Sequence, residues 1–130
     1  FVLPELFSNN KFSNENLIDK TVLVNFFASW CIPCKEEHHL LMKIKKKNPN
    51  LLIVGINHKD KKNDAINFLN NEGNPYNLVG IDENSNVAIA FGVFGLPESF
   101  LINKKGKIIF KHIGPISKEV LKNDIQPLLD

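Results

Sequence analysis

The chain has 130 residues, of which 43% are hydrophobic and 23% charged, as in ordinary soluble globular proteins. These proportions exclude a disordered chain and a disulfide-dense miniprotein, and the length predicts one domain over residues 1–130. The 16 basic residues, all lysines, leave a net charge of +2, which is too small and too evenly spread for a nucleic-acid surface. No apolar run approaches the roughly 18 residues that a transmembrane helix needs.

The first half of the chain predicts an extension, a strand and a helix. Residues 1–20 contain scattered apolar side chains and turn formers, which predicts a short hairpin or an irregular cover. Residues 22–28 form a continuous β-branched and aromatic run, typical of a central strand buried on both faces. Residues 35–47 contain neither Gly nor Pro and have apolar residues at helical spacing, so we expect a helix there.

The rest of the chain continues this alternation. Gly106 follows two lysines between two apolar runs and predicts a hairpin turn with positive φ. The remaining expected elements are a strand over 51–57, a helix over 61–72, a strand over 76–81, a short helix over 86–91, strands over 99–103 and 107–113, and a C-terminal helix capped by Ser117 and running towards Leu129. The predicted fold class is α/β, with a central mixed sheet, helices on both faces and an N-terminal β extension.

The two cysteines, Cys31 and Cys34, lie where the predicted central strand meets the predicted helix. A helix N-terminus stabilises a thiolate through its free N–H groups and partial positive charge, and Cys31 should gain most. The spacing allows the two sulfurs to bond, so the pair can alternate between dithiol and disulfide. Pro33 suits the first helical turn, where its missing N–H costs nothing.

Two other readings of the pair remain open. Half of a zinc site would need two further ligands, and His38 and His39 are too close in sequence to give the usual geometry. A purely structural disulfide would close so short a loop that it would stabilise the fold little. A strand, a CxxC pair and a helix in succession favour thiol–disulfide exchange.

The sequence resembles the thioredoxin superfamily from Val22 onward, and within it the cytochrome c maturation oxidoreductases called CcmG or DsbE. The resemblance rests on the WCxxC motif at residues 30–34, the expected cis-proline at Leu96-Pro97, and the segments 34–38, 92–102 and 111–115. It implies a redox-active Cys31-Cys34 disulfide, with no other cofactor and no metal.

The resemblance also implies partners and a location. It implies a periplasmic reductant that is recharged by a membrane electron donor of the DsbD type and acts on apocytochrome c or on a CcmH-like protein. Because the chain opens at Phe1 rather than Met, we expect that an N-terminal membrane anchor was removed. A monomer is the simplest expectation for a protein that must expose a docking surface.

An acidic side chain is expected beside the cysteines. Glu37 falls on the same helical face as Cys34, whereas Glu36 faces solvent. Burial should raise the pKa of Glu37 and let it accept the proton of Cys34, although pairing with a lysine or capping of local backbone is the alternative. Many thioredoxins carry a buried Asp six residues before the first cysteine; Asn25 stands there and cannot exchange a proton.

The expected partner-binding residues surround the pair. Pro97 is expected to be cis and to leave the backbone of Leu96 free to pair with an extended substrate segment. Glu98 is either a second acid near the disulfide or a strand-end residue in water, and Trp30 and Phe94 are either an apolar rim or core. The full expected substrate-binding set is Trp30, Ile32, Pro33, Phe94, Leu96, Pro97 and Glu98.

The expected mechanism makes Cys31 the attacking thiolate, Cys34 the resolving cysteine and Glu37 the proton acceptor, with Cys31, Cys34 and Glu37 as the catalytic set. Two rivals are a general reductase of the TlpA type and an oxidase of the DsbA type. A rival of another class is a copper or zinc chaperone that uses both cysteines and a histidine.

Overall fold

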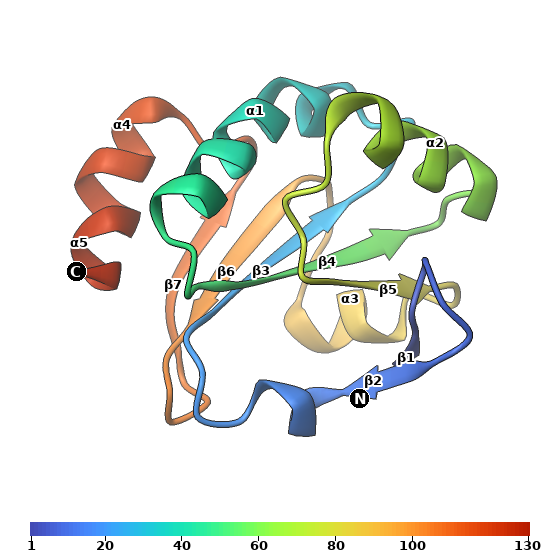
Figure 1. The fold of residues 1–130 in the computed structure, drawn as a ribbon, viewed down its shortest axis with the longest axis horizontal. Coiled ribbons are helices and arrows are strands. Elements are labelled where there is room, and N and C mark those ends of the chain that lie inside the picture. Colours follow the sequence, from blue (N-terminus) through green and yellow to red (C-terminus); the bar gives the residue numbers. More distant parts are fainter.

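The computed structural model describes residues 1–130 as a five-stranded mixed sheet covered on both faces (Figure 1). The strand order is β5-β4-β3-β6-β7, in which β3 is parallel to β4 and antiparallel to β6. The elements are β1 (Val2–Pro4), β2 (Lys11–Ser13), a 3₁₀ turn (Asn14–Leu17), β3 (Val22–Phe27), α1 (Ile32–Lys47), β4 (Leu52–His58), α2 (Lys62–Glu72), β5 (Leu78–Asp82), α3 (Asn86–Phe91), β6 (Glu98–Ile102), β7 (Ile108–Ile113), α4 (Lys118–Val120), a π-helical turn (Leu121–Ile125) and α5 (Gln126–Leu129).

The two faces of the sheet carry separate apolar clusters. On one face, α1, α2 and the C-terminal helical segment cover a cluster that includes Leu23, Phe27 and both cysteines. On the other face, α3 and the β1–β2 hairpin cover a cluster that includes Val24, Phe26 and Phe100 (Figure 1). Every residue of β3 is buried, which confirms the central strand and the α/β class expected from the sequence.

The N-terminal extension is an antiparallel hairpin packed beside β5. The backbone of Leu6 donates to the carbonyl of Val79, and Glu5 bridges to Gly80. A Cβ at Gly80 would lie 2.6 Å from the Leu3 side chain, so a glycine is needed for this close approach.

Most observed boundaries lie within one residue of the expected ones, and three larger departures have a structural reason. Helix α1 begins at Ile32 rather than at residue 35, because Cys31 caps it and Pro33 is accommodated in its first turn. Strand β5 begins at Leu78 rather than at residue 76, because the N–H of Tyr76 is bound by the Asn74 side chain at 3.0 Å. Within the C-terminal helix, the N–H of Gln126 bonds to the carbonyl of Leu121 in a π-helical register immediately before Pro127, which lacks an N–H.

Two turn expectations are confirmed. Gly106 has φ of 79° in the β6–β7 hairpin. Ser117 accepts a hydrogen bond from the N–H of Val120 at 3.1 Å and thus begins the C-terminal helix.

Candidate active site

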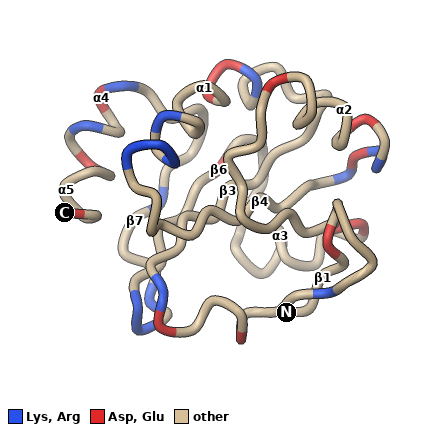
Figure 2. The backbone as a smooth tube through the Cα atoms, in the orientation of Figure 1, with Lys and Arg blue, Asp and Glu red and all other residues tan.

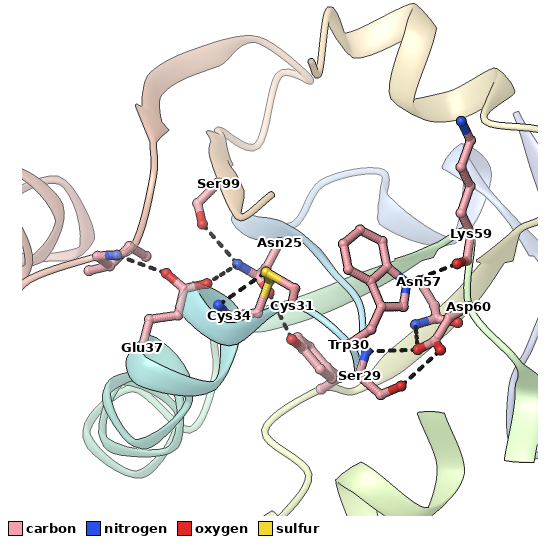
Figure 3. Close-up of a disulfide and its surroundings, with 12 residues drawn as sticks. Asn25, Ser29, Trp30, Cys31, Cys34, Glu37, Asn57, Lys59, Asp60 and Ser99 are labelled. Carbon is pink, nitrogen blue, oxygen red and sulfur yellow. Dashed lines mark hydrogen bonds between the residues drawn. A yellow bond between two sulfur atoms is a disulfide. The ribbon is translucent and has the colours of Figure 1, made fainter. Parts of the chain in front are cut away.

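Cys31 and Cys34 form a disulfide at the N-terminus of α1 (Figure 3). Cys31 is the N-cap residue, and its Sγ accepts a hydrogen bond from the N–H of Cys34 at 3.2 Å. In the dithiol form, this donor and the helix dipole would stabilise a thiolate on Cys31. The first turn of α1 contains no acidic residue, whereas its last turn carries Lys45, Lys46 and Lys47 (Figure 2).

The turn before Cys31 is held by a carboxylate that sequence reasoning missed. Asp60 accepts hydrogen bonds from the N–H and the hydroxyl of Ser29 at 2.7 and 2.8 Å, and from Asn57 at 3.1 Å. The indole N–H of Trp30 donates to the carbonyl of Lys59 at 2.9 Å (Figure 3). The β4–α2 loop therefore fixes the approach of the chain to the disulfide, a contact between segments about 30 residues apart that no local pattern predicts.

Glu37 is buried on the same side of α1 as Cys34, as its helical position predicted. Its Oε1 accepts from the Asn25 side chain at 2.8 Å and its Oε2 accepts from the N–H of Ile116 at 2.8 Å. Burial raises the pKa of Glu37 to about 7, although these two hydrogen bonds pull that pKa downward. The expected rise is thus confirmed, and no lysine lies within ion-pair distance of Glu37.

Asn25 joins Glu37 to two further buried side chains. Its Nδ2 also donates to the Ser99 hydroxyl at 3.0 Å, and its Oδ1 accepts from the Tyr76 hydroxyl at 2.7 Å. Burial raises the pKa of Tyr76 well above its ordinary range. The resemblance to thioredoxins singled out Asn25 by its position six residues before Cys31, but nothing marked Ser99 or Tyr76, which lie far from it along the chain.

The Leu96-Pro97 peptide bond is cis, as expected. The carbonyl of Pro97 accepts from the N–H of Gly114 at 2.9 Å, and Leu96 packs against the cluster that contains both cysteines. Leu96 therefore joins the core cluster of the cysteines from a segment more than 60 residues away along the chain.

Glu98 is buried, so the alternative of a strand-end residue in water is wrong. Its side chain shares a face of β6 with Phe100, in the α3-side cluster, whereas Ser99 faces Asn25. Its Oε2 accepts from the N–H of Phe94 at 3.0 Å, and Lys111 lies 3.6 Å from its Oε1. The structure thus joins Glu98 to the loop before Pro97 and not to the Glu37 network, because alternate strand residues point to opposite faces.

The four remaining residues of the expected binding set are at the surface. Trp30 is 58% exposed, Ile32 69% and Phe94 99%, and Pro33 is exposed beside Cys34. An apolar side chain as exposed as Phe94 contributes almost nothing to the core. No group of three or more His, Cys, Asp or Glu side chains is arranged to hold a metal ion. None of the helices is both long and apolar enough to cross a membrane.

The chain matches the family model named Redoxin over residues 3–126. It is 45% identical to the thiol:disulfide interchange protein CycY of Rhizobium leguminosarum bv. viciae, over 85% of this chain and 59% of that protein. It is 42% identical to DsbE of Tatumella citrea, over 90% and 63%, and 38% identical to HelX of Rhodobacter capsulatus, over 98% and 72%. It therefore spans about three fifths of the length of CycY and of DsbE from Tatumella citrea.

A solved structure agrees with these relatives. The crystal structure of a putative thiol:disulfide interchange protein DsbE from Chlorobium tepidum superimposes with a TM-score of 0.85 at 29% identity, covering 100% of this chain and 93% of that one. The two chains therefore share one fold over almost their whole lengths. The chain belongs to the Redoxin family, with the thioredoxin fold, and within it to the DsbE group of thiol:disulfide interchange proteins.

Proposed function

We propose that this protein is a thiol:disulfide oxidoreductase that reduces disulfides in apocytochrome c, or in a CcmH-like partner, during cytochrome c maturation in the periplasm. The observation that carries the activity is the Cys31-Cys34 pair at the N-terminus of α1, one turn before a buried carboxyl whose pKa is about 7. The names of the relatives support the reaction class.

The reaction transfers two electrons in two exchanges. The Cys31 thiolate attacks the partner disulfide, so that a Cys31–partner bond forms, the partner's S–S bond breaks and one partner thiolate leaves. The Cys34 thiol then gives its proton to Glu37 and attacks Cys31, which forms the Cys31-Cys34 disulfide and releases the second partner thiolate. Glu37 returns the proton to that thiolate, the first partner thiolate takes a proton from water, and the partner leaves as a dithiol.

The docking surface is proposed on exposed apolar side chains that flank Cys31 in the sequence or lie in the loop before Pro97. Trp30, Ile32 and Phe94 offer apolar area to a partner, and the backbone of Leu96 would pair with its extended cysteine segment. No acidic side chain lies in the first turn of α1, so nothing on that turn opposes the attacking thiolate. A DsbD-type membrane protein would then return the disulfide to the dithiol form.

A trapping experiment tests this function. The Cys34→Ser variant is mixed with an oxidised CxxCH peptide, the haem-attachment motif, and we expect a stable mixed disulfide through Cys31. The matched Cys31→Ser variant should trap nothing, and oxidised insulin serves as the unrelated disulfide. Trapping through Cys34 would reverse the assigned order of attack, and equal rates with insulin would indicate a general reductase.

The equilibrium reduction potential separates a reductant from an oxidant. In a glutathione series, a value at or below roughly −200 mV places the pair on the donor side of a scale that runs from about −270 mV for thioredoxin to about −120 mV for DsbA. A value near −120 mV would contradict the proposed direction of electron flow.

A further inference from the structure

A buried amide with three polar partners lies beneath the disulfide. Asn25 donates from Nδ2 to Glu37 and Ser99 and accepts at Oδ1 from Tyr76. Asn25 and Ser99 are fully buried, Glu37 is 1% exposed and Tyr76 7% exposed. Solvent therefore does not replace a missing hydrogen bond in this cluster, and each partner constrains the others.

The lack of a side chain at Gly55 leaves space for the Tyr76 ring. Asn25 on β3 pairs with Gly55 on β4, and a Cβ at Gly55 would lie 3.0 Å from the Tyr76 ring. The ring stacks on Phe27 with centroids 4.9 Å apart. The absent side chain at Gly55 thus lets the ring lie against β4, which places its hydroxyl 2.7 Å from Asn25 Oδ1.

The hydrogen bonds favour one orientation of the Asn25 amide. With Nδ2 towards Glu37, both amide hydrogens and the Tyr76 hydroxyl hydrogen have acceptors. If the amide were flipped, Oδ1 would face the ionised carboxylate of Glu37, one amide hydrogen would lose its acceptor, and the Tyr76 hydrogen would have none. The hydroxyl of Tyr76 consequently penalises the flipped state.

We propose that Tyr76 is a positioning residue: its hydroxyl locks the Asn25 amide so that an N–H always faces the Glu37 carboxyl, which keeps that carboxyl ready to accept a proton from Cys34. The locking of Asn25 depends only on the contacts of the oxidised protein. The use of Glu37 by Cys34 rests on the function proposed above.

Few groups around Glu37 could shift its pKa. Its hydrogen-bond donors are Asn25 from β3 and the backbone N–H of Ile116 from the β7–α4 loop, and Cys34 lies one turn before it on the same side of α1 (Figure 3). Tyr76 and Ser99 face it through Asn25. Of these, the titratable groups are Tyr76 and, in the dithiol form, the cysteines.

The test replaces only the hydroxyl. In Tyr76→Phe the ring still stacks on Phe27, but Asn25 Oδ1 loses its donor and the amide is free to turn. Loss of a steady donor disfavours the ionised carboxyl, so we expect the pKa of Glu37, followed by side-chain carboxyl NMR in the oxidised protein, to rise by about 0.5–1 unit. An unchanged or lower pKa in a folded Tyr76→Phe protein overturns the proposal.

Two further variants separate positioning from packing. Phe68→Leu alters the same apolar cluster without touching the hydrogen bonds, and its Glu37 pKa should match that of the wild type. In an Asn25→Ala background, or in Asn25→Ser if Asn25→Ala does not fold, adding Tyr76→Phe should produce less than half of the shift seen in the wild-type background. A full shift there would show that Tyr76 does not act through Asn25 and would overturn the proposal.

An activity measurement distinguishes this inference from the proposed function. With the oxidised CxxCH peptide, Tyr76→Phe should slow resolution by about 3- to 10-fold at pH values below the pKa of Glu37, and should have no such effect in a Glu37→Gln background. If the NMR shift is present but the pH–rate profile does not move, the locking of Asn25 by Tyr76 stands and the proton-accepting role of Glu37 falls.

Discussion

Each face of the central sheet buries one glutamate, and the two are supplied with different partners. On the α1 face, Glu37 is held by an amide and a backbone N–H, all neutral donors. On the α3 face, Glu98 is held by the backbone of the Phe94 loop and lies 3.6 Å from the Lys111 ammonium. A buried acid without a cation can exchange a proton near neutral pH, whereas one beside a lysine is suited to holding a loop.

The largest expected effect is on the rate of resolution. Glu37→Gln removes the proton acceptor but keeps the side-chain volume, so we expect the Cys34 step to slow by about 10²- to 10³-fold and to lose its pH dependence near 7. Stopped-flow release of the reduced CxxCH peptide measures this step. Glu36→Gln, on the exposed side of the helix, is the matched control and should change the rate less than about twofold. If Glu37→Gln resolved the mixed disulfide at the wild-type rate, Glu37 would not be the proton acceptor, and this functional difference between Glu37 and Glu98 would disappear.

The same carboxyl should make the stability of the oxidised protein depend on pH. The pKa of Glu37 is about 7 in the folded state against an ordinary value of 4.5, so the folded state binds the extra proton between these values. Stability is therefore lost as the pH rises from about 4.5 to about 7, by about 3 kcal/mol, and this contribution is constant above that range. Urea unfolding of the wild type and of Glu37→Gln across this range isolates the effect. If the free energies of unfolding of the two proteins changed in parallel with pH, Glu37 would be ionised in the folded state across the whole range.

Removal of the Glu98 side chain should lower the stability of the fold more than it affects the exchange reaction. Glu98→Ala leaves the Phe94 N–H without its acceptor and opens a void, so we expect a loss of about 2–3 kcal/mol in the free energy of unfolding. Glu98→Gln keeps an oxygen for the loop and should lose only about 1 kcal/mol, because Lys111 is partly exposed and its ion pair is weak. Urea unfolding gives both values. Equal losses in the two variants would show that the charge of Glu98, rather than its hydrogen bonds to the loop, holds this face together.

The sequence predicts the site well where the signal is local. The CxxC pair after a buried strand, the helical position of Glu37 and the turn at Gly106 each depend on neighbouring residues, and the structure has all of them. The partners of Asn25 are different, because the pairing of β3 with β6 brings Ser99 to it and the packing of the segment before β5 against Gly55 of β4 brings Tyr76 to it. Because alternate strand residues point to opposite faces of the sheet, Glu98 shares a face with Phe100, but no local pattern indicates which face carries the cysteines.

The smallest effect on stability is expected at Phe94, which the Glu98 carboxylate holds at the surface. Its ring is 99% exposed, so Phe94→Ala should change the free energy of unfolding by no more than about 0.5 kcal/mol. If the partner binds this ring, Phe94→Ala should nonetheless raise the KM for the oxidised CxxCH peptide several-fold while leaving the reduction potential unchanged. Ile89→Ala, which removes an exposed apolar side chain from α3, is the control for general loss of apolar surface. Equal KM values for Phe94→Ala and the wild type would confine partner recognition to the α1 face.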